Sequence, residues 1–552
     1  MRLLYLRKYT YTILLLSLIL FSSFSYANKQ YEIHLKDLQY LQKYVNGNSL
    51  EMLKPFRIDN YDYYFDHDGI YYYGFDGIQN NWIKIKNTII YPTPKIAWSP
   101  CSKEVMNGDN KVTIDYECGK IQVPINWSKP NGQKINVALV RLKAKNSSKR
   151  VGALVMNPGG PGASSINMAV ESYNELKYQE LAKSFDLIGM DPRGVGESSP
   201  IKCSAKFSGK SLYPENEIEF NSMINENEEF YDSCYKKTGE LLNYVDTINV
   251  VRDLNAVRIA LGEEKLNFFG ISYGTSIAAM YAELFPDNSR ALVLDSVLDH
   301  SILTASEFAA SKGELLESNF MSFVRWCDND IKCKANNNSI LKLFENVVQN
   351  LNINPIEIPN NEIKINGDIY TTIIMIMLTY GKEDWETLGN HLIKAPFQGD
   401  YNYLIQNTLN YADNLKNNDS NRVISCSDYS YNLKTWDEFL KYKQTMIATS
   451  KHFYSIITTV SKCAGWKGKA MNPPRKINIL KEQPVLLIGV SNDLITPYKW
   501  AQNVFQQIPG SSLITYNGFG HGGYAASACV RNFVNLFLIT GEKPAQNITC
   551  NN

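Results

Sequence analysis

Three side chains with the chemistry of nucleophilic catalysis occur in the order serine, aspartate, histidine. Ser272 is the centre of a Gly-Ile-Ser-Tyr-Gly pentapeptide, Asp493 follows an apolar run over 485–489, and His521 lies between two glycines. A serine hydroxyl is a weak nucleophile at neutral pH, so it needs a base that takes its proton and an acid that orients the base. We therefore expect Ser272 as nucleophile, His521 as general base and Asp493 as the orienting acid.

The residues around Ser272 predict a strand, a sharp turn and a helix. An apolar run over 266–269 precedes the pentapeptide, and a stretch of small residues over 276–280 follows it. Such a turn lifts the serine hydroxyl above a sheet, and the flanking glycines leave room for it. The pentapeptide alone recurs by chance in long chains, so this context and the order of the three residues carry the interpretation.

A glycine-rich loop lies upstream of the serine. Residues 157–162 read Asn-Pro-Gly-Gly-Pro-Gly and follow an apolar strand predicted over 153–156. Glycines let backbone N–H groups approach a ligand closely. We expect the N–H groups of Gly160 and Tyr273 to hold the oxyanion, where one such donor typically lowers the barrier by ~3 kcal/mol.

The base is better defined by the sequence than the acid. The other five histidines lack a glycine-flanked loop just after a late strand. Asp295 and Asp299, in contrast, follow another apolar strand over 291–294, where some serine hydrolases carry the acid. Both therefore remain alternatives to Asp493.

These motifs carry a resemblance to a known family. The loop at 157–162, the segment Phe185–Ser198 with its Asp-Pro-Arg-Gly sequence, and the pentapeptide resemble the secreted tripeptidyl-aminopeptidase-like branch of the proline-iminopeptidase group of α/β-hydrolases. In that branch Asn-Pro replaces the His-Gly-Gly start of the loop. The resemblance runs from about Trp98 to the C-terminus and is weakest between about 300 and 475.

The resemblance implies a fold and a function. The fold is the α/β-hydrolase fold, a mostly parallel sheet flanked by helices, here with a large helical lid and an N-terminal accessory region. The implied activity is that of a serine aminopeptidase, which releases short N-terminal fragments or single residues from peptide substrates without cofactor or metal. An esterase or other acyl hydrolase is an alternative because fold does not fix substrate, and an inactive hydrolase-fold binding protein is another.

An aminopeptidase also needs groups that hold the ammonium of its substrate. Carboxylates offset the cost of desolvating this charge. Asp428 is the first candidate because residues 424–428, Ile-Ser-Cys-Ser-Asp, resemble a Cys-x-Asp element of the family's lid, with helix capping as the alternative role. Glu307, Glu314 and Glu317 are further candidates, although a charged helical face is normally solvated.

The order of elements predicts five segments. We expect an export signal over 1–27, a strand-rich accessory region over 28–95, a first core part over 96–300, a helical lid over 301–475 and a second core part over 476–552. The signal combines an early basic stretch, an apolar run over 13–21 and a small-x-small cleavage site ending at Ala27. The lid is expected to cover the site and shape access to it.

Composition limits the partners and the compartment. The net charge is +1 without a basic run, so nucleic acid is excluded as a partner. No later stretch is long and apolar enough to predict a stable membrane span after signal removal. In an exported chain, periplasmic or secreted, ten cysteines indicate disulfides. The simplest pairing follows chain order: 101 with 118, 203 with 234, 327 with 333, 426 with 463, and 529 with 550.

Overall fold

The computed structural model describes two units of the chain, Met1–Tyr91 and Pro92–Asn552. The described residues are 56–58, 61–65, 71–76, 81–86 and 95–551, without 108–109, 205–213, 336–337, 360, 362, 380, 417, 430, 432, 455–459 and 480. The predicted export signal over 1–27 lies outside the described residues.

Within the first unit, the described residues form a four-stranded sheet. Its antiparallel strands pair in chain order: β1 (Phe56–Ile58), β2 (Tyr61–Phe65), β3 (Tyr71–Asp76) and β4 (Asn81–Lys86). The tyrosine-rich stretches with period-2 patterning are therefore strands, as expected from residue types that favour a pleated surface.

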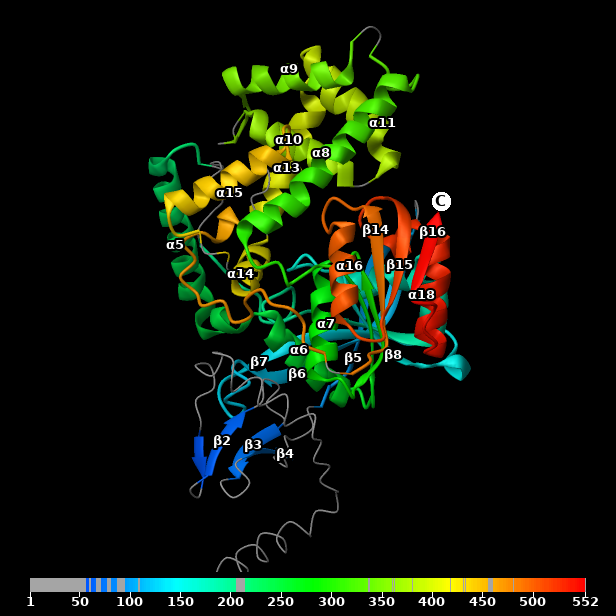
Figure 1. The fold of residues 1–552 in the computed structure, drawn as a ribbon. Coiled ribbons are helices and arrows are strands. Elements are labelled where there is room, and N and C mark those ends of the chain that lie inside the picture. The colour runs from blue at the N-terminus through cyan, green and yellow to red at the C-terminus, as the bar shows by residue number, and fades with distance from the viewer. Residues whose placement is uncertain are drawn as a thin grey trace, which may run out of the picture. The chain divides into compact units, whose positions relative to one another are not determined.

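A ten-stranded sheet organises the second unit (Figure 1). The spatial order is β16-β15-β14-β11-β10-β8-β9-β7-β6-β5. The first seven strands in this order are parallel to one another, and β7, β6 and β5 each pair antiparallel with the strand before them in this order. The strands are β5 (Ser99–Asn107), β6 (Asn110–Pro124), β7 (Lys134–Leu142), β8 (Gly152–Asn157), β9 (Phe185–Met190), β10 (Leu266–Ile271), β11 (Ser289–Asp295), β14 (Val485–Asn492), β15 (Ser512–Phe519) and β16 (Asn547–Asn551).

Helices cover both faces of the parallel part. On one face of the sheet, strand side chains such as Phe269 and Val293 pack into a hydrophobic cluster. The helices α3 (Ser165–Asn174), α4 (Gln179–Ser184) and α18 (Ala528–Thr540) contribute residues to the same cluster. Alternate residues such as Phe268 are also buried, on the side where α6 (Thr247–Ala260), α7 (Tyr273–Leu284) and α16 (Tyr498–Gln507) lie. Burial on both faces explains why these strands read as continuous apolar runs.

A helical insertion separates β11 from β14, which are nonetheless neighbours in the sheet. The described part of the insertion contributes no strand to that sheet. Its elements are α8 (Ala305–Asn329), α9 (Ile340–Ile353), a hairpin of β12 (Ile356–Glu357) and β13 (Lys364–Ile365), α10 (Gly367–Thr379), the short helices η5 (Lys382–Asp384), α11 (Trp385–Thr387), η6 (Leu388–Lys394) and α12 (Ala395–Phe397), then α13 (Asn402–Lys416), α14 (Asp419–Asp428), α15 (Trp436–Thr449) and η8 (Ser461–Cys463).

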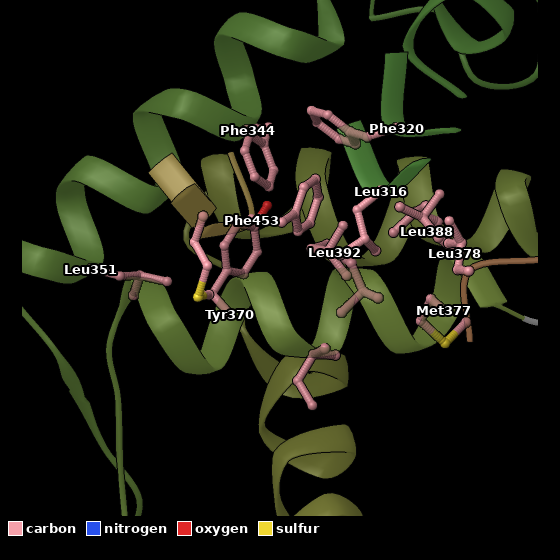
Figure 2. Packing of buried hydrophobic residues seen from close by; sticks show 14 of the residues in the cluster. Leu316, Phe320, Phe344, Leu351, Tyr370, Met377, Leu378, Leu388, Leu392 and Phe453 are labelled. Atoms are coloured by element: carbon pink, nitrogen blue, oxygen red, sulfur yellow. The ribbon is translucent and has the colours of Figure 1, made fainter. Parts of the chain in front are cut away.

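The insertion has a hydrophobic core of its own (Figure 2). Phe320 of α8 lies with its ring centroid 4.6 Å from that of Phe344 of α9 and 5.0 Å from that of Phe453. The helix α5 (Glu217–Thr238) precedes the insertion in the chain, yet its Phe220 packs into the same cluster. Chain order alone does not reveal that α5 belongs with the insertion.

All five predicted disulfides are confirmed. Cys101–Cys118, Cys203–Cys234, Cys327–Cys333, Cys426–Cys463 and Cys529–Cys550 are bonded. This pattern fits an exported protein, because disulfides persist in oxidising compartments. Among the described residues, helices long and apolar enough to span a membrane are absent.

Candidate active site

Ser272 stands at a strained turn between β10 and α7. Its backbone has φ 57° and ψ −123°, a conformation that non-glycine residues rarely adopt. The Ser272 N–H donates to the carbonyl oxygen of Asp295 at 2.9 Å, which ties the turn to the end of β11. Only 7% of the Ser272 surface is exposed. The expected strand, turn and helix are therefore present, with the serine at the tip of the turn.

The glycine-rich loop after β8 lies directly against this turn. A Cβ on Gly159 would lie 2.5 Å from the Ile271 carbonyl oxygen and 2.8 Å from the Tyr273 nitrogen, so only glycine permits this approach. The Asn157 side chain accepts the Gly159 N–H at 3.0 Å and shapes the loop. Tyr273 begins α7, so its N–H lacks an acceptor within the helix. The two predicted oxyanion donors thus belong to neighbouring segments.

His521 and Asp493 form a hydrogen-bonded pair. The Asp493 carboxylate oxygens lie 2.9 and 3.0 Å from His521 Nδ1, and Asp493 is fully buried. Burial lowers the pKa of His521, but attraction to Asp493 outweighs it, so this pKa lies above its ordinary value. Burial raises the pKa of Asp493, but the charge and the hydrogen bond of His521 outweigh this effect, so the pKa of Asp493 lies below its ordinary value.

The pairing through Nδ1 leaves His521 Nε2 as the nitrogen that could take a proton. Within the described residues, a hydrogen bond between Ser272 Oγ and His521 is not formed. Catalytic hydrogen bonds are often long without substrate and tighten when it binds. Asp493 also accepts the N–H groups of Ile495 and Thr496 at 2.9 and 3.0 Å, which fix its orientation.

The two alternative acids have other partners. Asp295, fully buried, accepts the N–H groups of Gly523 and Tyr524 at 2.8 and 2.9 Å. These donors lie two and three residues after His521, so Asp295 holds the segment that follows the histidine through backbone hydrogen bonds. Burial raises the pKa of Asp295 to about 6. Asp299 accepts from the backbone N–H of Ser301 at 2.8 Å.

Asp428 is the last residue of α14, and its carboxylate contacts the first residue of α6. Its carboxylate accepts the Thr247 N–H at 2.9 Å, the Thr247 hydroxyl at 2.5 Å and the Asn472 side-chain amide at 3.2 Å. The Thr247 hydroxyl in turn is 2.6 Å from the Tyr273 hydroxyl. This is the capping arrangement named above as the alternative role, and contact with a substrate amine stays a prediction. Burial raises the pKa of Asp428 to about 7.

Of the three candidate glutamates on α8, two are paired with other residues and one is exposed. Glu307 completes a capping box with Thr304 at the start of the helix. Glu317 pairs with His452, with Oε1 2.5 Å from Nδ1, and Glu314 is exposed. Sequence reasoning missed two lysines near the site, Lys312 of α8 and Lys462 of η8. Neither stands in a motif, so only the structure reveals their position.

The mostly parallel sheet flanked by helices is the architecture of the α/β-hydrolase fold. Family matches agree: residues 152–334 match a family described as alpha/beta hydrolase fold, and residues 453–550 match one described as TAP-like protein. The chain therefore has the α/β-hydrolase fold and a C-terminal part similar to the TAP-like family, which confirms the predicted fold and resemblance.

Several curated proteins are similar over most of the chain. The serine protease Hip1 of Mycobacterium tuberculosis is 28% identical over 480 residues, covering 82% of this chain and 91% of that protein. The tripeptidyl aminopeptidase of Streptomyces lividans is 28% identical over 487 residues, covering 82% of this chain and 86% of that protein. Carboxylesterase B of Mycobacterium tuberculosis is 25% identical over 488 residues, covering 83% and 90%.

Proposed function

We propose that the chain is an exported serine peptidase that hydrolyses peptide bonds near the free N-terminus of peptides through an acyl-enzyme. The observation that carries the chemistry is the hydrogen-bonded pair of buried Asp493 and His521 at the same sheet edge as the strained Ser272 turn. Carboxyl ends of parallel strands meet at one edge, and these residues follow β14, β15 and β10. The names of the relatives that are peptidases support peptides as the substrates.

The proposed reaction proceeds in two halves. The Ser272 oxygen attacks the scissile carbonyl carbon while its proton passes to His521 Nε2. The resulting oxyanion accepts hydrogen bonds from the N–H groups of Gly160 and Tyr273. The C–N bond then breaks, and the leaving amine takes the proton from His521. A water molecule, deprotonated by the same nitrogen, hydrolyses the Ser272 ester and releases the N-terminal fragment.

We further propose that the helical insertion acts as a lid over this site. It contacts the glycine-rich loop directly, because the Asn421 side-chain amide of α14 donates to the Pro161 carbonyl oxygen at 2.9 Å. Ser420 of the same helix donates to the Gly194 carbonyl oxygen at 2.7 Å. Contacts of this kind let a lid control which substrates reach the serine.

The test is a panel of fluorogenic substrates. Free-amine mono-, di- and tripeptide substrates are compared with their N-acetylated counterparts and with simple esters, and Ser272→Ala serves as the control. We expect the highest kcat/KM on a free-amine peptide, and the length of the best peptide gives the number of residues released. A preference for acetylated peptides would overturn the aminopeptidase proposal.

An esterase is the second candidate, favoured by the relative named carboxylesterase B. The same triad cleaves esters, so the panel separates the two through kcat/KM on esters and on peptides. An inactive binding protein is the third reading. Covalent labelling of Ser272 by a serine-reactive phosphonate would exclude it, since labelling requires an activated nucleophile.

A further inference from the structure

The helix α14 of the insertion contacts the segment that carries the first predicted oxyanion donor. In its first turn, the Asn421 side-chain amide donates to the Pro161 carbonyl oxygen at 2.9 Å. Pro161 follows Gly160 directly. A Cβ on Gly162 would lie 3.0 Å from the Asn421 nitrogen, so the glycine-rich loop packs closely against this turn of the helix. Asn421 therefore holds the Gly160 side of the predicted oxyanion hole.

The last residue of α14 reaches the second predicted donor through two hydroxyl groups. The Asp428 carboxylate accepts the Thr247 hydroxyl at 2.5 Å, and the Thr247 hydroxyl oxygen lies 2.6 Å from that of Tyr273. A threonine hydroxyl has one proton, so when it donates to the carboxylate it can only accept from Tyr273. The chain of hydrogen bonds that starts at Asp428 thus ends at the residue whose N–H is the second donor.

The fixed length of the helix relates these two contacts. Asn421 and Asp428 belong to the same α-helix and are separated by about 10 Å along its axis. Each end has a further contact: Ser420 donates to the Gly194 carbonyl oxygen at 2.7 Å, and the Asn472 amide donates to Asp428 at 3.2 Å. Because both ends are held, the helix fixes the distance between the two segments that carry the donors.

The Tyr273 side chain can pass this constraint to its own backbone. The residue is 2% exposed, so its ring cannot move without displacing packed neighbours. It follows Ser272, whose φ of 57° is a strained conformation that persists only where the surroundings over-determine it. The Thr275 hydroxyl, which donates to the Ser272 carbonyl oxygen at 2.6 Å, is one such contact. The anchored Tyr273 ring is another.

We propose that α14 is a brace of the oxyanion hole, in which Asn421 and Asp428 are positioning residues for Gly160 and Tyr273. The brace rests on the proposed function, since it acts on the oxyanion of that reaction. Oxyanion donors must lie about 2.7–3.1 Å from the developing charge, so a small change in their spacing weakens them. The helix α14 belongs to the insertion by chain order but acts with the core through these contacts. Its substitutions should therefore affect peptides and esters alike.

The experiment compares an aryl oxoester with the matching thionoester, in which sulfur replaces the carbonyl oxygen. Sulfur accepts hydrogen bonds weakly, so the oxoester-to-thionoester ratio of kcat/KM reports on the oxyanion hole. The amount of folded enzyme cancels within each ratio. The intrinsic reactivities of the two esters cancel when a variant is compared with the wild type.

Thr247→Val removes the hydroxyl in the middle of the chain and keeps the shape of the side chain, whereas Thr247→Ser retains the hydroxyl. We expect Thr247→Val to shrink the ratio by about tenfold, through kcat with an unchanged KM, because the contact matters only when the oxyanion forms. Thr247→Ser should keep the wild-type ratio. Tyr273→Phe should match Thr247→Val, and the double variant should lose no more than either single variant, since both break the same chain. Fully additive losses would overturn this link.

Asn421→Leu tests the other end of the brace and should also shrink the ratio by about tenfold. Ser425→Ala is the matched control. Asn421 and Ser425 both accept from Lys462 Nζ, at 2.8 and 3.3 Å, but Asn421 also holds Pro161. The control should keep the wild-type ratio. A ratio left unchanged by either Asn421→Leu or Thr247→Val would overturn the brace, because the helix must be held at both ends.

The esters also separate this proposal from the proposed function. If peptides are not cleaved but the ester ratio responds as expected, the peptidase proposal fails and the brace stands. If peptides are cleaved and the ratio does not respond, the brace fails and the peptidase proposal stands. If the wild type turns over neither class and the phosphonate does not label Ser272, no oxyanion forms and both proposals fail.

Discussion

The sheet core and the helical insertion place their side chains by different means. In the core, Ser272, Asp493 and His521 follow strands whose parallel register brings their ends to one edge. In the insertion, Lys312 stands on a long helix, and Lys462 depends on a disulfide and on hydrogen bonds to α14. We therefore expect the core and the insertion to have different effects on activity. Core substitutions should affect every substrate alike, whereas substitutions in the insertion should change which substrates are preferred.

The largest effect is expected for Ser272→Ala. Removal of the nucleophile should lower kcat/KM by about 10⁵-fold or more on peptides and esters alike, with an unchanged melting temperature. A serine-reactive phosphonate should label the wild type at Ser272 alone, as read by peptide mass spectrometry. Undiminished turnover by the variant would remove the assignment of the site.

The next largest effects are expected for substitutions of His521 and Asp493. His521→Ala should cost about as much as loss of Ser272, because the three residues act as a unit, and Asp493→Asn about 10⁴-fold. Asp295→Asn serves as the comparison, since Asp295 holds the histidine loop only through backbone N–H groups. We expect it to cost about tenfold. The reverse order of the two aspartate variants would move the acid to the end of β11.

The pH profile tests the electrostatics of the core. His521 must be neutral to act as a base, and the Asp493 charge holds its pKa above the ordinary value. The kcat/KM should therefore be full above this raised pKa and fall as the pH drops through it. Asp493→Asn should shift the acidic limb of the profile to lower pH. An unshifted limb would show that another group governs the titration.

Asp428→Asn probes the boundary between the two regions. Because the carboxylate is occupied by Thr247 and Asn472, we expect similar losses on a free-amine peptide and on its N-acetylated counterpart. A loss restricted to the free-amine substrate would instead establish Asp428 as the ligand of the substrate amine. Thr247→Val, which removes one donor to Asp428, is the matched control.

The smallest effect should come from the disulfide that joins α14 to η8. The double substitution of Cys426 and Cys463 by serine should lower the free energy of unfolding by about 2–4 kcal/mol, as measured by denaturant titration. Loss of activity on all substrates in proportion would contradict the division between core and insertion.

The sequence predicts the core much better than the insertion. The strands that precede the site residues are continuous apolar runs, so β8, β10, β11 and β14 lie within a few residues of the runs over 153–156, 266–269, 291–294 and 485–489. The pairing of cysteines in chain order is correct because each bridge closes a short local loop. Both patterns are local, and local patterns can be recognised from the sequence alone.

Other features depend on contacts between distant segments. Lys312 is an ordinary lysine of an amphipathic helix, and its position over the Trp500 ring follows only from the docking of α8 on α16. The motif around Asp428 is visible in the sequence, but its hydrogen bond with Thr247, far away in the chain, is not. The assignment of α5 to the core overlooked Phe220, whose partners Trp436 and Phe439 come much later.

The adjacency of β11 and β14 across the insertion has a consequence for the newly made protein. Synthesis delivers Ser272 with the first part of the sheet, whereas Asp493 and His521 arrive only after the whole insertion has been made. Closing so long a loop slows the final pairing, although the helices between can fold through local contacts. Until then the serine has no base and remains a weak nucleophile. Under the proposed function, the growing chain thus carries its nucleophile in an inert form while it is still being made.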